Sequence, residues 1–340
     1  FLKKIEKSTI DLALKYVNND ACYPTMFVVG QFLEALQSGK YDTNRVSVLM
    51  TQTGGACRAS NYVGLIRKAL KDSGFGHVPV IALSVQGIEG NPGFNLTPSL
   101  IKKGLFAVLY GDLLMRLSNA SRPYEKIKGS TEVLLSNWIE KLKDDVRDGK
   151  YHTFKRNVKD IIFDFKRLEK TDIKKPRAGI VGEILVKFLP QANNFVQRTL
   201  EEEGLEVILP DLIDFLMYCL TNPKNKQSSF GGFRKSKFLS GIGIWYIETY
   251  RNFVRKALKD AGYDYPLRIE ELEALASEVV SLNHQYGEGW LLTAEMIELI
   301  HSEAPNIVCV QPFGCLPNHL TGKGSIKAIR EKYPQSNIIA

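Results

Sequence analysis

The chain has 340 residues, of which 44% are hydrophobic and 24% charged, a composition typical of a globular protein with one large domain or two. It contains no run of about 18 uncharged apolar residues, which excludes a conventional transmembrane helix, and no signal peptide, so a cytoplasmic protein without a membrane partner is expected. The net charge of +8 comes without a nucleic-acid-binding motif, and no nucleic-acid partner is expected.

Buried strands alternate with helices along the chain. Apolar runs typical of parallel strands occupy residues 46–51, 78–84, 178–184, 205–210 and 306–311. This alternation predicts an α/β fold in which helices flank parallel sheets. The same order of strand, loop and helix occurs in both halves, which predicts two lobes with a cleft between them.

Composition divides the chain into three parts. Residues 1–125 form the first α/β lobe with its N-terminal helices, and residues 126–175 form a bridge of charged, solvent-facing helices that ends near Pro176. Residues 176–340 form the second lobe, in which the polar residues 221–231 are expected to be a surface loop. Because the chain starts without methionine and stops on a strand-like segment, we interpret it as part of a longer polypeptide with a truncated second lobe.

Three of the five cysteines lie where a loop leads into a predicted helix. Cys22 precedes a helix that we expect Asp20 to cap, whereas Cys57 and Cys315 each follow a predicted strand. Loops at the carboxyl ends of parallel strands gather at one edge of a sheet, and a helix N-terminus favours the thiolate form of cysteine. These three cysteines are therefore the candidate ligands of a metal centre.

Three convergent thiolates would hold a [4Fe–4S] cluster, or a larger derivative, with one iron open to a further ligand. Cys309, His319, water or a substrate could take the open position. Cys309 lies inside a predicted strand, where packing is the alternative role. Cys219 falls on the apolar face of a predicted helix and is assigned to the core.

Other kinds of site compete with a cluster. The three loop cysteines together with His319 could bind zinc, or His319 could activate Cys315 as a catalytic thiol, as in an acyl transferase. Glu288 stands in a glycine-flanked loop before a predicted helix. It could act as a general acid or base, or its charge could stabilise the helix N-terminus. The catalytic candidates are Glu288 and His319.

Six segments resemble the 2-hydroxyacyl-CoA dehydratase superfamily, and specifically the dehydratase-like portion of the large activase-related proteins, which are related to the double-cubane-cluster reductases. The similarity extends over nearly the whole chain. The segments are residues 15–24 (KYVNNDACYP), 51–62 (TQTGGACRASNY), 122–125 (RPYE), 179–187 (GIVGEILVK), 287–296 (GEGWLLTAEM) and 311–319 (QPFGCLPNH).

This resemblance implies two flavodoxin-like lobes with an iron–sulfur cluster between them, bound at Cys22, Cys57 and Cys315, with Cys309 as a further candidate. It also implies an ATP-hydrolysing activator, carrying its own cluster, that supplies a low-potential electron. In the dehydratases this electron goes to a 2-hydroxyacyl-CoA thioester, whose ketyl radical expels the hydroxyl group before the electron is recycled. The expected partners are thus the activator, a CoA thioester or another small substrate, and a second copy of the chain. The alternative is a zinc-bound or metal-free assembly module that docks the activator.

Overall fold

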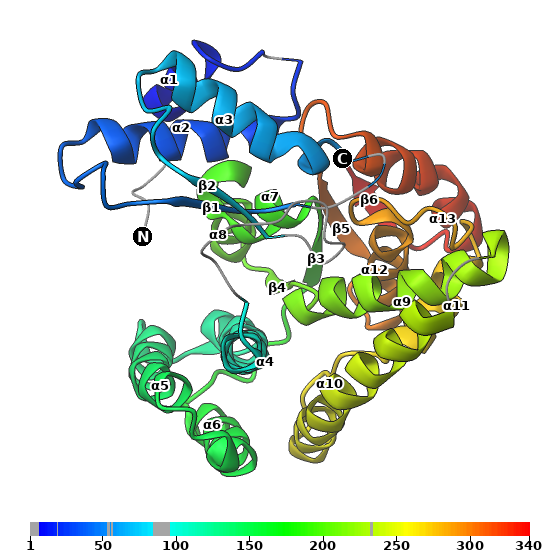
Figure 1. Cartoon of the computed structure of the whole chain (residues 1–340). Helices are drawn as coiled ribbons and strands as arrows, with labels where there is room; N and C mark the ends of the chain where they lie inside the picture. The colour runs from blue at the N-terminus through cyan, green and yellow to red at the C-terminus, as the bar shows by residue number, and fades with distance from the viewer. Residues whose placement is uncertain (1–6, 19, 53–54, 56, 84–95, 232–233) are drawn as a thin grey trace.

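In the computed structural model, helices surround two parallel sheets, which confirms the predicted α/β class (Figure 1). Within the described parts of the chain, every helix is too short or too polar to cross a bilayer. The structure describes residues 7–18, 20–52, 55, 57–83, 96–231 and 234–340.

The smaller sheet pairs β1 (Val48–Thr51) in parallel with β2 (Val80–Leu83), as the apolar runs predict. Between these strands the chain forms α3 (Tyr62–Asp72), whose apolar face buries Ile66 and Leu70. This face packs in one core with α2 (Tyr23–Gln37), which α1 (Lys7–Leu14) contacts along its length. The first cysteine-bearing loops thus belong to a compact unit at the top of Figure 1.

The larger sheet is parallel and has the strand order β4–β3–β5–β6. Numbered along this part of the chain, that order is 2-1-3-4, the order in which flavodoxin-like sheets begin. Apolar side chains face both sides of the sheet and are covered by helices. The elements are β3 (Arg177–Gly182), α7 (Ile184–Phe188), α8 (Val196–Glu202), β4 (Glu206–Ile208), α12 (Gly289–His301), β5 (Asn306–Val310), α13 (Ile326–Lys332) and β6 (Asn337–Ile339).

A third, purely helical layer joins the predicted bridge to both neighbouring parts of the chain. The bridge helices are not simply solvent-facing, because α6 (Phe154–Arg167) buries Val158, Ile161 and Phe165 completely. The charged residues of α6 lie on its outer face and most of its apolar residues on its inner face. The high charge content of the segment alone does not reveal this amphipathic arrangement. The predicted division at residues 125 and 175 stays a prediction. The layer contains α4 (Pro98–Asn119), α5 (Ser130–Arg147), α6 (Phe154–Arg167), α9 (Leu212–Phe230), α10 (Arg234–Ala261) and α11 (Ile269–Ser277).

The predicted surface loop at residues 221–231 is wrong, because α9 continues through it to Phe230. Polar side chains of this stretch have partners elsewhere in the fold. Asn222 accepts a hydrogen bond from the Trp290 indole at 3.2 Å, and Asn225 donates to Glu273 at 2.6 Å. These tertiary contacts outweigh the weak helix propensity of the segment.

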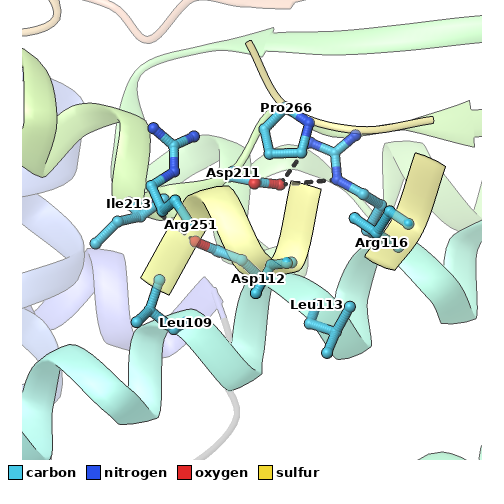
Figure 2. Close-up of a pocket in the computed structure, with 10 residues that line it drawn as sticks. Leu109, Asp112, Leu113, Arg116, Asp211, Ile213, Arg251 and Pro266 are labelled. Carbon is cyan, nitrogen blue, oxygen red and sulfur yellow. Dashed lines mark hydrogen bonds and ion pairs between the residues drawn. The ribbon is translucent and has the colours of Figure 1, made fainter. Parts of the chain in front are cut away.

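A buried ionic cluster holds α4, α9 and α10 together around a small cavity (Figure 2). The Asp112 carboxylate accepts two backbone N–H bonds from the first turn of α9, each 2.9 Å long. Arg116 pairs with Asp211 at 2.7 Å, and Arg251 pairs with Asp214 at 2.5 Å. Each charge therefore has a partner inside a core that would otherwise exclude it.

Replacing Arg251 with methionine should destabilise the fold strongly. Arg251 is 2% exposed, and its loss would leave Asp214 as a buried charge without its partner, at a cost of roughly 3–5 kcal/mol. Urea denaturation measures this difference. The matched control is Arg198→Met, which breaks a pair with Glu202 on the surface and should leave the urea midpoint unchanged. Equal midpoints for the two variants would contradict the assignment of this cluster as a structural anchor.

Candidate functional site

The carboxyl ends of β3 and β5 meet where the strand order of the larger sheet reverses. The two strands pair in parallel, with Gly182 opposite Val310. Open α/β sheets bind ligands at this kind of topological switch point. The residues that follow are Glu183 on one side and the loop of residues 311–319, which contains Cys315, on the other.

The Cys315 loop touches the start of α2. The Phe313 carbonyl accepts the Tyr23 N–H at 2.9 Å. Gly314 has a φ of 72°, and a Cβ added to it would lie 3.2 Å from the Cα of Cys22. Glycine adopts this conformation without strain and leaves room for this close approach. The loops of Cys22 and Cys315 are therefore in direct contact.

Cys57 joins the same group of loops. The Arg58 guanidinium donates to the carbonyl of Asp20, which ties the Cys57 loop to the segment before α2. Gly287 has a φ of 58°, and a Cβ on it would lie 3.8 Å from Cys57 Sγ and 2.7 Å from Pro317. Gly287, in the loop before α12, thus lies between Cys57 and the Cys315 loop and is close to both.

Cys22, rather than Asp20, is the capping residue of α2, so the predicted cap was placed two residues too early. Its side chain makes no capping bond and is 4% exposed. The sulfur lies 2.6 Å from the Tyr62 hydroxyl and 3.4 Å from the Thr25 hydroxyl. Burial, followed by the neighbouring Cys22, raises the pKa of the Tyr62 phenol far above its ordinary value. The phenol consequently stays protonated and can donate.

Cys315 is buried and linked to Glu288 through one amide. Asn318 Nδ2 donates to Cys315 Sγ at 3.1 Å and to Glu288 Oε2 at 2.9 Å. Asn318 is completely buried, and within the described parts of the chain its Oδ1 has no hydrogen-bond partner. Burial and then the charge of Glu288 raise the pKa of the Cys315 thiol.

Two buried carboxyl groups, Glu183 and Glu288, lie at the start of α7. Glu183 Oε2 accepts the Val186 N–H at 2.8 Å, and Glu288 Oε1 accepts the Ile184 N–H at 2.9 Å. Glu288 therefore stabilises the N-terminus of α7 rather than that of its own helix. One turn further on, Lys187 pairs with Glu295 at 2.8 Å, and burial raises the pKa of Glu295 to about 7.

The other candidate residues lie outside this group. His319 is exposed, and its Nδ1 donates to the Cys315 carbonyl at 2.6 Å rather than to the sulfur. Cys309 is 2% exposed in the core behind β5, where burial raises its pKa to about 12. Cys219 packs half-buried against the helical layer, in line with its assignment to the core.

The donor chemistry at the meeting loops suits an iron–sulfur cluster, because the three candidates are cysteines and such clusters are bound through thiolates. The structure brings the loops of Cys22, Cys57 and Cys315 together. Among the residues described, however, no three His, Cys, Asp or Glu side chains are grouped closely enough to hold a metal ion. Ligation by the three sulfurs stays a prediction.

Tyr62 and Thr25 were not identified as site residues from the sequence. Tyr62 belongs to a motif that already carries Cys57, so its position close to a cysteine was available as a signal. Nothing in the sequence indicates that its hydroxyl reaches Cys22 rather than Cys57, since this depends on how α3 packs against α2. Thr25 reads as an ordinary first-turn residue of a helix.

Comparison of the chain with protein-family models, with curated proteins and with solved structures gives no match.

Glu183 should make the stability of the metal-free protein depend on pH. Burial, followed by the charge of Glu288, raises its pKa from 4.5 to about 8. The folded chain therefore keeps a proton that the unfolded chain loses, and the free energy of unfolding falls as the pH rises from 4.5 to about 8. Glu183→Gln should make this dependence shallower in urea denaturation. The control Glu202→Gln, on the surface, should keep the wild-type slope, and an unchanged slope in Glu183→Gln would contradict the shift.

Proposed function

We propose that the chain is an iron–sulfur redox module of the 2-hydroxyacyl-CoA dehydratase type that accepts low-potential electrons from an ATP-dependent activator. The observation that carries this proposal is the meeting of three cysteine-bearing loops at the switch point of a parallel sheet. A bound cluster supplies one-electron transfer. Cys22, Cys57 and Cys315 would hold it.

The positions of the similar segments also support the proposal, because two segments without a cysteine, residues 179–187 and 287–296, lie at the same place as the three that carry the cysteines. Five of the six segments that resemble the dehydratase superfamily contribute residues to the site, although they lie far apart along the chain. Only the segment at residues 122–125 lies elsewhere, with Arg122 bound to Glu132 and Glu201. If the chain shares ancestry with a cluster-binding family, segments that are far apart in the sequence but form one site would retain their similarity to that family.

The carboxylates give the site a second capability. Glu183 and Glu288 stand beside Cys315, and burial raises the pKa of both. A buried carboxyl group whose pKa is raised can act as a general acid or base toward a substrate. In a dehydration, such a group would give its proton to the departing hydroxyl, which leaves as water, and would regain a proton from the neighbouring substrate carbon as the double bond forms. The electron returned at the end would leave the reaction redox-neutral. We assign this role to Glu288, with a CoA thioester as the substrate class.

A metal-free assembly module that docks the activator is the alternative. It is favoured by one observation, namely that the sulfurs of Cys22 and Cys315 already have hydrogen-bond partners within the chain. A catalytic thiol has less support, because the contact between His319 and Cys315 runs through the backbone carbonyl. Stoichiometric zinc and unfolding on chelation would indicate a zinc-bound form of the module.

Anaerobic purification should yield a brown protein with about four or more irons per chain. Cys57→Ser and Cys315→Ser should lose the iron and the visible absorption, because each removes a predicted ligand. Cys219→Ser is the matched control and should keep both, since Cys219 packs against the helical layer. A colourless, iron-free wild-type preparation would rule out the cluster, as would serine variants that retain full iron.

A further inference from the structure

Two of the candidate sulfurs each face a buried polar side chain, which comes from a distant helix for Cys22 and from the same loop for Cys315. Tyr62 is the first residue of α3, and its hydroxyl lies 2.6 Å from Cys22 Sγ. Asn318 belongs to the same loop as Cys315, three residues further along, and its amide nitrogen lies 3.1 Å from Cys315 Sγ. Tyr62 is 5% exposed and Asn318 is 0% exposed, so neither group can satisfy its hydrogen bonds with bulk water.

The Asn318 side chain points its amide nitrogen, rather than its amide oxygen, toward its two neighbours. Its two N–H bonds go to Cys315 Sγ and to a Glu288 carboxyl oxygen, and its buried Oδ1 has no partner among the residues that the structure describes. An orphaned buried oxygen is unfavourable. The orientation is therefore explained by what the two N–H groups gain from a carboxylate and an electron-rich sulfur.

The backbone at Asn318 also has an unusual conformation. Asn318–Gly322 forms a π-helix, a conformation that is rare and occurs frequently at functional sites. The Thr321 side chain closes this turn by donating to the Pro317 carbonyl at 2.9 Å. The turn therefore holds Asn318 rigidly beside Cys315.

Tyr62 can likewise donate a hydrogen bond to the sulfur of Cys22. When Cys22 is a thiol, either group could be the donor. When the sulfur is a metal ligand it has no proton, and only the phenol can donate. The ring is packed in the core that joins α2 and α3, so the hydroxyl cannot turn away.

We propose that Tyr62 and Asn318 are positioning residues that hold the Cys22 and Cys315 sulfurs by hydrogen bonds and thereby raise the reduction potential of the cluster bound there. This inference rests on the proposed function. Hydrogen bonds to the sulfurs are among the factors that set cluster potentials. They stabilise the reduced state more, because reduction places additional negative charge on the sulfurs.

The test is an anaerobic redox titration of the iron-loaded protein, followed by electron paramagnetic resonance. Tyr62→Phe removes one oxygen atom, and Asn318→Ala removes both donors. Each variant should keep its iron and have a lower midpoint potential than wild type, and the double variant should have the lowest. Asn318→Gln, which restores an amide donor, should recover part of the loss.

Two variants control for the loss of a buried hydrogen bond elsewhere. Tyr110→Phe removes a buried phenol that accepts from Asn157 in the helical layer. Asn225→Ala removes an amide that donates to Glu273. Both should keep the wild-type potential, because neither residue contacts a candidate sulfur.

Each outcome decides between the claims. Wild-type iron content and wild-type potential in Tyr62→Phe and Asn318→Ala would overturn the inference while leaving the proposed function intact. Loss of iron from a folded Tyr62→Phe or Asn318→Ala, with iron retained in the controls, would also overturn the inference, because the positioning role requires the cluster to stay bound. If Asn318→Ala fails to fold, Tyr62→Phe alone decides. A wild-type chain that binds no iron overturns the proposed function and this inference with it.

Discussion

The parallel pairing of β3 with β5 is the constraint on which the candidate site depends. It places the start of α7 and the loop of residues 311–319 at the same edge of the larger sheet. From there the loop reaches α2 through Phe313 and Gly314, which joins the larger sheet to the unit that contains Cys22 and Cys57. Without this pairing, the three cysteine-bearing loops would have no common meeting point.

The charges buried at this edge are better explained by chemistry than by stability. Glu183, Glu288 and Glu295 all have raised pKa values because they are buried. Only Glu295 has a bonded cation, Lys187, and buried ion pairs add little to stability compared with apolar packing. Backbone N–H groups of α7 hold the other two carboxylates. The fold thus keeps protonatable groups beside Cys315, whereas the Arg251–Asp214 pair in the helical layer serves to anchor helices.

The sequence is sufficient to predict elements that are apolar along their whole length. It is not sufficient for elements that depend on one or two specific tertiary contacts. The strands around Val48, Ile180 and Ile307 are evident, because parallel strands are apolar on both faces. The extension of α9 past Thr221 is not evident, since it depends on contacts such as that of Asn222 with Trp290. The site follows the same rule. The meeting of the cysteine loops follows from topology. The Tyr62 contact with Cys22 depends on how α3 packs against α2, and the Asn318 contact with Cys315 depends on the local turn that follows the cysteine.

The central claim is that one iron–sulfur cluster lies among Cys22, Cys57 and Cys315. The most direct measurement is an anomalous difference map at the iron absorption edge from anaerobically grown crystals. The account predicts iron density enclosed by these three sulfurs, beside Asn318 and the start of α7. Iron bound at Cys219 or Cys309 instead, or a single zinc ion in place of a cluster, would contradict it.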